Sequence, residues 1–303
     1  MAVSVTFDRS AQLASYAGLV WECITGRRSA KLVLLGFLRR RIVRRWVARH
    51  AGEPFPCRMP SGGKLLLDPT HWFIENYYAG FGDFEPDLQR ALTRMLRPGA
   101  TFIDCGANAG FFSVFANDML QGNGTVVAIE ANPRLLEELN RNLEANSIPP
   151  PAIHRAIASR KGIVDFFVPS RVDVLGGMRP TAVIRDDEMS RISVPASTLD
   201  EIVAELGLQR VDVVKIDIEG AELEALRSAE GTIERDRPVL LVEYNPTNWK
   251  QYGARHEDLE ALCDRCRYRI CRYDIARDAP VPVEPSFWES ELANMVLIPE
   301  VAA

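Results

Sequence analysis

The chain has 303 residues, of which 47% are hydrophobic, 25% charged and 8% aromatic, the proportions of an ordinary globular protein. Its 20 Gly and 19 Pro exclude a collagen-like or largely disordered chain. No apolar run reaches the roughly 18 residues that span a bilayer. The first ten residues lack the basic-then-apolar pattern of a secretory signal. We therefore expect a cytoplasmic protein.

The formal charge of −5 is unevenly distributed. Residues 1–50 carry ten Lys or Arg against two acids, a net +8, so the other 253 residues carry −13. Within this basic segment Leu35, Leu38, Ile42 and Trp46 recur every three or four residues, which predicts an amphipathic helix. The simpler interpretation packs that helix on the rest of the protein. The alternative is peripheral contact of residues 27–49 with an anionic membrane. An acidic body argues against nucleic-acid binding.

The next elements lead into the main fold. A hairpin is predicted over residues 57–68, a short aromatic-rich helix over 70–78, and a helix over 85–97, where Pro86 suits the first turn. We expect three parts: a basic N-terminal helical segment (1–55), a lead-in hairpin with helices covering the site (56–99), and a main domain (100–303). An inserted flap is expected at about 170–195.

From residue 101 onward strands and helices alternate, which predicts an α/β fold with a mostly parallel sheet and helices on both faces. An antiparallel pair, formed by residues 268–273 and 294–298, is expected at the sheet edge. The predicted parallel strands are 101–105, 125–130, 152–157, 211–217 and 239–243, and the predicted helices between them are 111–118, 133–146, 199–206 and 221–235.

A glycine-containing turn follows the first of these strands. Gly106 and Gly110 allow close approach of a ligand to the backbone, and Glu130, 20 residues after Gly110, ends the next strand, where an acid can accept both ribose hydroxyls. These features predict a nucleoside cofactor. Asn108 replaces the middle glycine of a dinucleotide-binding loop, and the Asp104 carboxylate would repel a pyrophosphate. Charge therefore favours S-adenosylmethionine, which carries a sulfonium and an ammonium, over a nicotinamide dinucleotide.

A second acidic motif ends the strand at 211–217. Asp217, Glu219 and Glu222 lie within six residues, and the strand ends carrying Asp104 and Asp217 are expected to be neighbours at the point where strand order reverses. Their carboxylates should then face one site. Glu219 and Glu222 have a structural alternative, because acids suit the first turn of a helix.

A divalent metal is compatible with this edge but not required. Asp217, Glu243 and Asn245 could together bind Mg²⁺ through oxygen ligands, although nothing in their spacing demands it. Cys263, Cys266 and Cys271 form a CxxC-x4-C pattern, but the pattern lacks a clear fourth ligand, so ordinary thiols are expected there rather than zinc.

Six segments carry a resemblance to a known family. They are FEP at 84–86, IDCGANAGFFS at 103–113, IEANP at 129–133, STLDE at 197–201, KIDIEGAE at 215–222 and VE at 242–243. Over about residues 80–275 the chain resembles FkbM-type S-adenosylmethionine-dependent methyltransferases in motif order and spacing. The resemblance implies a Rossmann-like class I methyltransferase fold. It also implies O-methylation of a hydroxyl on a small-molecule or glycan acceptor, such as a sugar, a glycolipid or a polyketide.

The resemblance also implies roles for individual residues. The methionine end of the cofactor would be held with the help of Glu85, the ribose by Glu130, and the adenine would lie beside Ala156 and Ile157. Asp217 and Glu219 would border the transferred methyl group. The residues implied around the methionine end are Asp104, Gly106, Asn108, Gly110, Ser113 and Asp217.

Transfer to an alcohol needs a base for the hydroxyl proton. Asp217 is the first candidate, followed by His71, one of only four histidines, and Glu219. Two other function classes stay open at this point. They are a nicotinamide-dependent oxidoreductase on a similar sheet, and a non-catalytic binding module that retains the cofactor fold. The sequence leaves the oligomeric state undetermined.

Overall fold

The computed structural model describes residues 41, 45, 49, 50, 53–68, 84–149, 151–169, 176–180, 189–290 and 292–300. The chain divides into two compact units, residues 1–53 with 72–84 and residues 54–71 with 85–303. In the first unit Arg41, Arg45 and Arg49 are helical and exposed. The apolar residues of the predicted amphipathic helix, and the predicted helix at 70–78 with His71, lie outside the described residues. No helix in the described part is long and apolar enough to cross a membrane.

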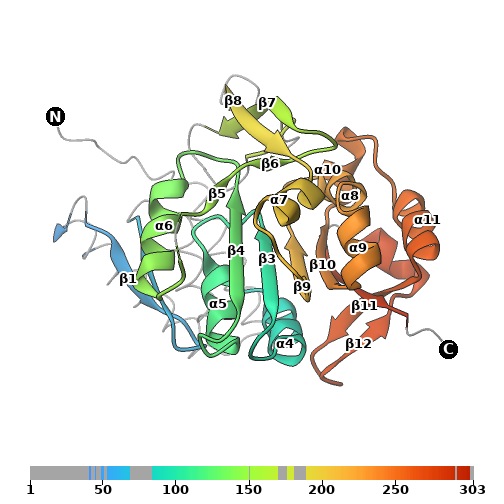
Figure 1. Cartoon of the computed structure of the whole chain (residues 1–303), viewed down its shortest axis with the longest axis horizontal. Helices are drawn as coiled ribbons and strands as arrows, with labels where there is room; N and C mark the ends of the chain where they lie inside the picture. Colours follow the sequence, from blue (N-terminus) through green and yellow to red (C-terminus); the bar gives the residue numbers. More distant parts are fainter. Residues whose placement is uncertain are drawn as a thin grey trace. The chain divides into compact units, whose positions relative to one another are not determined.

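The second unit is built on an eight-stranded sheet of order β12-β11-β13-β10-β9-β3-β4-β5 (Figure 1). The five strands from β10 to β5 pair in parallel, whereas β13, β11 and β12 are antiparallel. This sheet confirms the predicted fold class. The strands are β3 (Thr101–Cys105), β4 (Thr125–Glu130), β5 (Ile153–His154), β9 (Val213–Ile216), β10 (Val239–Tyr244), β11 (Tyr268–Asp274), β12 (Ala279–Pro282) and β13 (Ala293–Pro299).

Helices cover both faces of this sheet. On one face α7, α8, α9 and α11 share a buried apolar core with alternate residues of the strands, Ile103 and Cys105 on β3 and Val214 and Ile216 on β9 among them. Because side chains alternate across a strand, the intervening residues face α4 and α5 on the other side. The helices are α4 (Pro86–Met95), α5 (Phe111–Met119), α6 (Leu136–Ala145), α7 (Leu199–Glu205), α8 (Glu222–Arg227), α9 (Glu230–Asp236), α10 (Pro246–Gln251) and α11 (His256–Cys266).

Two predicted elements are divided in the structure. The strand expected at 152–157 breaks at Arg155 into β5 and β6 (Ala156–Ile157), and β6 joins a separate sheet of order β6-β8-β7. The helix expected at 221–235 breaks at Ser228 into α8 and α9. There the Ser228 carbonyl accepts from the backbone N–H of Asp200, and its hydroxyl accepts from that of Leu199. The Ser228 carbonyl, which in a continuous helix would accept from an N–H of the same helix, therefore bonds to the start of α7 instead.

The second sheet contains the hairpin β7 (Gly162–Pro169) and β8 (Met189–Ser197), which pair antiparallel throughout. It lies in the region of the expected flap. Of the residues between its strands, 176–180 are described. Gly177 exchanges two backbone hydrogen bonds with Phe167, and the N–H of Arg179 donates to the hydroxyl of Tyr252 at 3.0 Å. This connection therefore contacts the residue that directly follows α10.

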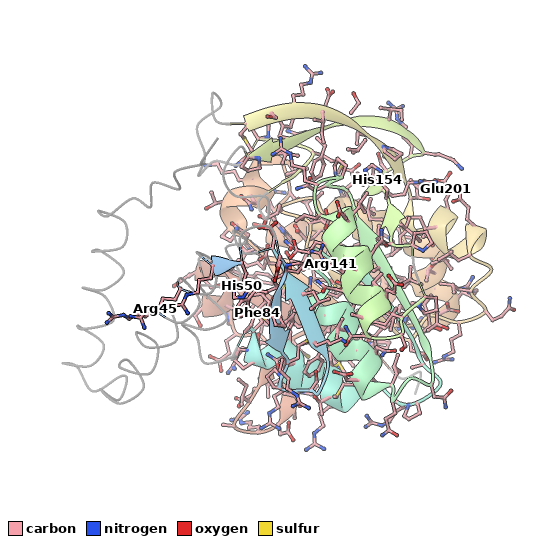
Figure 2. All side chains as sticks on the ribbon, turned by 90° about the vertical axis from the view of Figure 1, so that its left-hand side faces the viewer. Arg45, His50, Phe84, Arg141, His154 and Glu201 are labelled. Carbon is pink, nitrogen blue, oxygen red and sulfur yellow. The ribbon has the colours of Figure 1, made fainter. Side chains whose placement is uncertain are left out.

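A hairpin of β1 (Phe55–Arg58) and β2 (Lys64–Leu67) lies against α6, as the blue and green ribbons show (Figure 2). Three α6 side chains at four-residue spacing bind successive outward amides of β2 and of Asp68, the residue that directly follows it. Glu138 Oε1 accepts from Asp68 at 2.8 Å, Asn142 Oδ1 from Leu66 at 2.6 Å, and Asn146 Oδ1 from Lys64 at 3.0 Å. The three bonds can form together because one turn of a helix advances about 5.4 Å, close to the roughly 6.8 Å that two residues advance along a strand. We call these three side chains the α6 ladder.

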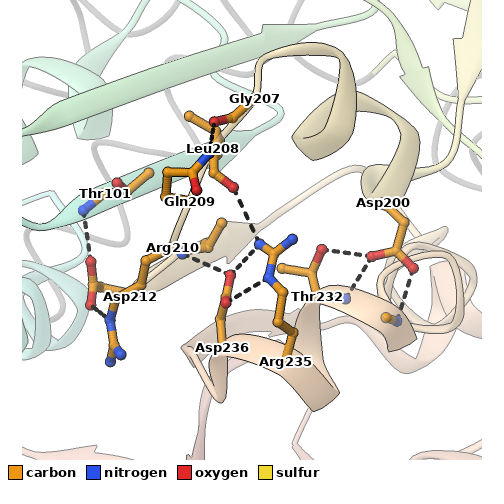
Figure 3. A network of polar contacts seen from close by, with 12 residues as sticks. Thr101, Asp200, Gly207, Leu208, Gln209, Arg210, Asp212, Thr232, Arg235 and Asp236 are labelled. Carbon is orange, nitrogen blue, oxygen red and sulfur yellow. Dashed lines mark hydrogen bonds and ion pairs between the residues drawn. The ribbon is translucent and has the colours of Figure 1, made fainter.

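At the amino end of the central strands, charged groups are paired (Figure 3). Asp212 accepts from the backbone N–H of Thr101 at 2.9 Å and from Arg210 Nε at 2.6 Å, which ties β9 to β3. Asp236 accepts from the N–H of Val211 at 2.9 Å and pairs with Arg235. These carboxylates hold the sheet in register, in contrast to the acids at its opposite edge.

Candidate functional site

Charged side chains from adjacent strands lie together on the α4–α5 face, at the carboxyl edge of the sheet. Asp104 of β3 stands opposite Lys215 of β9 in the parallel register, which confirms that these two strands are neighbours. Glu243 of β10 follows Val242, a residue of the other face's core, and so shares the face of Asp104. Asp217 comes directly after β9, and its N–H donates to the carbonyl of Cys105 at 3.1 Å.

Lys215 is the cation at the centre of this group. Its Nζ lies 2.9 Å from Asp217 Oδ2 and 3.7 Å from Asp104 Oδ1, and 5.2 Å from the centroid of the Phe112 ring. Burial lowers the pKa of Lys215, but Asp217 and Asp104 raise it by more, so the amine stays charged. Ser113 Oγ donates to Asp104 Oδ2 at 2.7 Å. Ser113 thus supports Asp104 from the first turn of α5.

The glycine turn, residues 106–110, uses its own amides internally. The N–H groups of Gly106 and Ala107 both donate to the carbonyl of Ile129 at 3.0 Å. Asn108 N–H donates to Glu130 Oε2 at 2.8 Å. The remaining two donors are Ala109 N–H, bonded to Asn108 Oδ1 at 2.7 Å, and Gly110 N–H, bonded to the carbonyl of Ala107 at 2.8 Å. No amide of this turn is left to bind a phosphate.

Gly106 also has a steric role. Its φ is +79°, and a Cβ there would lie 1.9 Å from the backbone oxygen of Asp217. Only glycine permits the glycine turn and the end of β9 to approach so closely.

Glu130, at the end of β4, retains capacity to bind a ligand. Its Oε2 accepts from Asn108 N–H, and its Oε1 accepts from Asn132 N–H at 2.7 Å. Each carboxylate oxygen has two acceptor positions, and with Ala131 as a further backbone donor the carboxylate is still not saturated. Burial raises the pKa of Glu130, and the backbone donors oppose that shift.

In the second acidic loop, residues 217–222, Glu222 and Glu219 have different roles. Glu222 is fully buried, and its Oε1 accepts from the N–H groups of Ile218 at 2.9 Å and Gly220 at 3.1 Å. It therefore holds the loop, from a position in the first turn of α8. Glu219 has a φ of +58°, rare for a residue other than glycine, and accepts from Asn248 Nδ2 at 2.9 Å. Burial, together with Asp217, raises the pKa of Glu219 to about 8.

Glu85 and Glu243 extend the acidic group toward α4. Glu85 precedes α4 in a left-handed conformation and lies 3.5 Å from Asn294 Nδ2. Burial and Asp217 raise its pKa to about 8. Glu243 Oε2 is buried and has no hydrogen-bond partner within the described residues. Burial and Asp217 likewise raise the pKa of Glu243 well above its ordinary value. Carboxyl groups thus outnumber cations at this edge.

Some predicted site residues lie elsewhere or have other partners. Asn245, a conditional metal ligand, caps α10 by accepting from Asn248 N–H at 3.1 Å. No group of three or more His, Cys, Asp or Glu in the described ranges is arranged to bind a metal. Ala156 and Ile157 are buried in β6. His71 lies outside the described residues.

Sequence reasoning assigned no role to Lys215 or Asn248. A lysine inside the apolar run VDVVKIDIEG was the available signal for Lys215, because a buried lysine needs acidic partners. Asn248 carries no such signal, since its contact with Glu219 depends on how α10 packs.

Comparison with known proteins places this geometry in a family. A family model described as the Methyltransferase FkbM domain matches residues 104–270. The methyltransferase sdnD of Sordaria araneosa is 26% identical over 205 residues, 59% of this chain and 76% of that protein.

Two solved structures are similar to the chain. An FkbM methyltransferase from Methylobacillus flagellatus is 16% identical with a TM-score of 0.43, over 75% of this chain and 53% of that one. An O-methyltransferase from Bacillus cereus, solved with SAH, is 11% identical with a TM-score of 0.41, over 71% of this chain and 81% of that one.

The family match spans more than half of the chain and includes both the glycine turn and the second acidic loop. The chain belongs to the FkbM methyltransferase family.

Proposed function

We propose that the protein binds S-adenosylmethionine at the carboxyl edge of β3, β4 and β9 and transfers its methyl group to a hydroxyl oxygen of an uncharged acceptor. The observation that carries this proposal is the combination of a glycine turn without free amides and a surplus of buried carboxyl groups. Such a site disfavours phosphate and favours a cation.

The engaged amides argue against a nicotinamide dinucleotide. Dinucleotide sites bind pyrophosphate through free N–H groups at a glycine turn and helix start. Here all five amides of residues 106–110 donate within the protein. The Asp104 carboxyl below the turn adds repulsion toward any phosphate. The oxidoreductase alternative therefore lacks the glycine-turn part of such an anchor.

The carboxyl groups match the charges of S-adenosylmethionine. Lys215 already pairs with Asp104 and Asp217, so we assign the ammonium group to Glu85, which has no ion pair among the described contacts. Asp217 would face the sulfonium, because its side chain is 27% exposed whereas that of Lys215 is 3% exposed. The remaining acceptor capacity of Glu130 would serve the ribose hydroxyls.

When bound, S-adenosylmethionine supplies a methyl group on a cationic sulfur; transfer forms the oxygen–carbon bond, and the pair of the broken carbon–sulfur bond stays on sulfur. The chain must hold the acceptor oxygen in line with that bond, and such orientation can contribute about 7–11 kcal/mol. It must also accept the hydroxyl proton.

Glu219 is the better base on electrostatic grounds, and Asp217 the alternative. Asp217 is already engaged as the ion-pair partner of Lys215 at 2.9 Å. The pKa of Glu219, raised by burial to about 8, is close to the value that suits a general base at neutral pH. Its left-handed backbone is the kind of strain found at functional sites.

The acceptor class follows from the same surplus of acids. Glu243 and Glu219 have no cationic partner among the contacts described, so an acceptor with a phosphate or carboxylate beside its reacting hydroxyl would find no pairing charge on them, and its own charge would oppose ionisation of Glu219 as the base. A neutral, hydroxyl-rich sugar, glycolipid or polyketide fits this edge. We place the acceptor on the side of Glu219 and Glu243, and the cofactor on the side of Asp104 and Glu130.

Ligand-dependent unfolding tests the cofactor. At 100 times its dissociation constant, S-adenosylhomocysteine should add about 2.7 kcal/mol to the free energy of unfolding, and NADH should add nothing. The reverse result would reject the proposal. Asp217→Asn should reduce the preference for S-adenosylmethionine over S-adenosylhomocysteine, which lacks the sulfonium charge, while Asp212→Asn at the opposite edge should not.

Methyl transfer tests the chemistry. We would measure S-adenosylhomocysteine release with matched pairs of acceptors, neutral glycosides against the corresponding uronic acids, and alcohols against their phosphorylated analogues. Neutral acceptors should react. Glu219→Gln should lower turnover at least about a hundredfold with unchanged cofactor affinity. A protein that binds S-adenosylhomocysteine but methylates neither kind of acceptor would be a binding module instead.

A further inference from the structure

Asn142 of α6 uses both ends of its side-chain amide. Its Oδ1 accepts from the N–H of Leu66 in β2 at 2.6 Å, and its Nδ2 donates to the carbonyl of Ala109 in the glycine turn at 2.8 Å. The side chain is fully buried. One residue therefore bonds the hairpin and the glycine turn through Leu66 and Ala109, which are 43 positions apart in sequence.

The bond to Ala109 fixes a peptide on which the rest of the turn depends. Ala109 N–H is bonded to Asn108 Oδ1, and Asn108 N–H is bonded to Glu130. A path of hydrogen bonds thus runs from Leu66 through Asn142 and the turn to the carboxylate that would hold the ribose. Movement at either end would be transmitted along it.

The turn also packs closely on α6. A Cβ added at Gly110 would lie 2.9 Å from Leu139 Cδ1 and 3.9 Å from Asn142 Cβ. The close packing leaves the turn little room to move away from the helix without breaking the bond to Asn142.

The other members of the α6 ladder provide a comparison within the same helix. Glu138 binds the amide of Asp68, directly after β2, and Asn146 binds that of Lys64 in β2. Asn146 Nδ2 also donates to the carbonyl of Lys64 at 2.7 Å. The bonds of the Asn146 side chain, within the part of the chain that the structure describes, go to Lys64 and to the carbonyl of Asn142 and not to the glycine turn. Asn142 is thus distinguished from Asn146 by its bond to the glycine turn.

We propose that Asn142 is a positioning residue that couples the β1–β2 hairpin to the glycine turn, so that hairpin order and cofactor binding strengthen each other. The inference rests on the proposed function, because it takes the glycine turn as the cofactor site. A fully buried side chain acts through the Ala109 carbonyl rather than by touching the cofactor. Because coupling between two sites is reciprocal, the cofactor must also stabilise the hairpin.

Three variants separate coupling from stability. Asn142→Ala removes both bonds. Asn142→Asp keeps the shape and the acceptor for Leu66 but, when ionised, cannot donate to Ala109. Asn146→Ala is the matched control, since it removes bonds to the same hairpin one turn along the helix. For each variant, urea unfolding, the Kd of S-adenosylhomocysteine by calorimetry, and amide hydrogen exchange at Leu66 would be measured.

In the wild type and in Asn146→Ala, S-adenosylhomocysteine should slow exchange at Leu66. In Asn142→Asp the amide of Leu66 should keep its protection without ligand but show no further slowing when the ligand binds. Both Asn142 variants should raise the Kd about tenfold, the scale of one lost hydrogen bond, while Asn146→Ala raises it less than twofold.

Equal Kd values in Asn142→Asp and Asn146→Ala would overturn the inference and leave Asn142 with a structural role only. If Asn142→Ala does not fold, the Asp variant decides alone. Failure of the wild type to bind S-adenosylhomocysteine would instead reject the proposed function, so the two failures are distinguishable.

Discussion

Substituting Gly106 by alanine tests the contact between the glycine turn and the second acidic loop. The added Cβ would lie 1.9 Å from the Asp217 carbonyl oxygen, whereas real Cβ contacts are essentially never shorter than 3.0 Å. The two strand ends must therefore separate by about 1 Å. A φ of +79° adds strain for any side chain. A shift of that size at a reacting centre can cost about a hundredfold in rate.

Gly99→Ala is the matched control. Gly99 has a φ of +92°, but a Cβ there would meet nothing within 4 Å. We expect Gly99→Ala to lose about 1 kcal/mol of unfolding free energy from backbone strain. Gly106→Ala should lose about 1–3 kcal/mol more through overpacking.

Urea unfolding measures the loss of unfolding free energy in each variant, and calorimetry measures the Kd of S-adenosylhomocysteine. Only the Gly106 variant should bind the ligand more weakly and lose methyl transfer. If the two variants bound S-adenosylhomocysteine with Kd values within twofold of each other, the close approach at Gly106 would not position the site, and the reasoning would fail.

Three further predictions concern the charged groups. Lys215→Met should cost about 3–5 kcal/mol in urea unfolding because it leaves buried carboxylates unpaired, and adding Asp104→Asn should recover part of that loss. The pKa values of Glu85 and Glu219, raised to about 8 by burial, mean that the folded state binds more protons than the unfolded state between about pH 4.5 and pH 8. The urea midpoint of the ligand-free protein should therefore fall as pH rises through that range, and should fall less in the Glu85→Gln, Glu219→Gln double variant. Burial raises the pKa of Glu222 to about 7. At pH 8 the Glu222→Gln variant should keep the unfolding free energy of the wild type, because the Gln side-chain oxygen still accepts from the two loop amides. Glu222→Ala should cost about 1–3 kcal/mol by leaving them unpaired; equal effects of Gln and Ala would contradict this role.

The parallel core and its acidic edge were predictable because they follow from local rules. Apolar runs ending in Asp104 and Asp217 mark strands whose carboxyl ends meet at one edge, whichever helices connect them. The close approach of these ends depends on Gly106, which the sequence also displays. The alternation of strands and helices, together with the common direction of the strands, was sufficient to predict that Asp104 and Asp217 lie at the same edge.

The remaining features depend on partners distant in sequence. The break at Ser228 arises because α7 bonds to its carbonyl and hydroxyl, and periodicity carries no trace of that contact. Arg155 divides a strand because its flanking residues pair with different sheets. The docking of β2 on α6 uses Asn142 and Asn146, which in sequence are two polar residues of an ordinary helix.

The α6 ladder also has a consequence for how this chain behaves among other copies of itself. The outer side of β2 would otherwise present amides that a strand of another molecule could extend, the usual route to edge-to-edge aggregation. Glu138, Asn142 and Asn146 bind those amides. The two-stranded hairpin can therefore stay separate from the main sheet without offering this side as a template for intermolecular pairing.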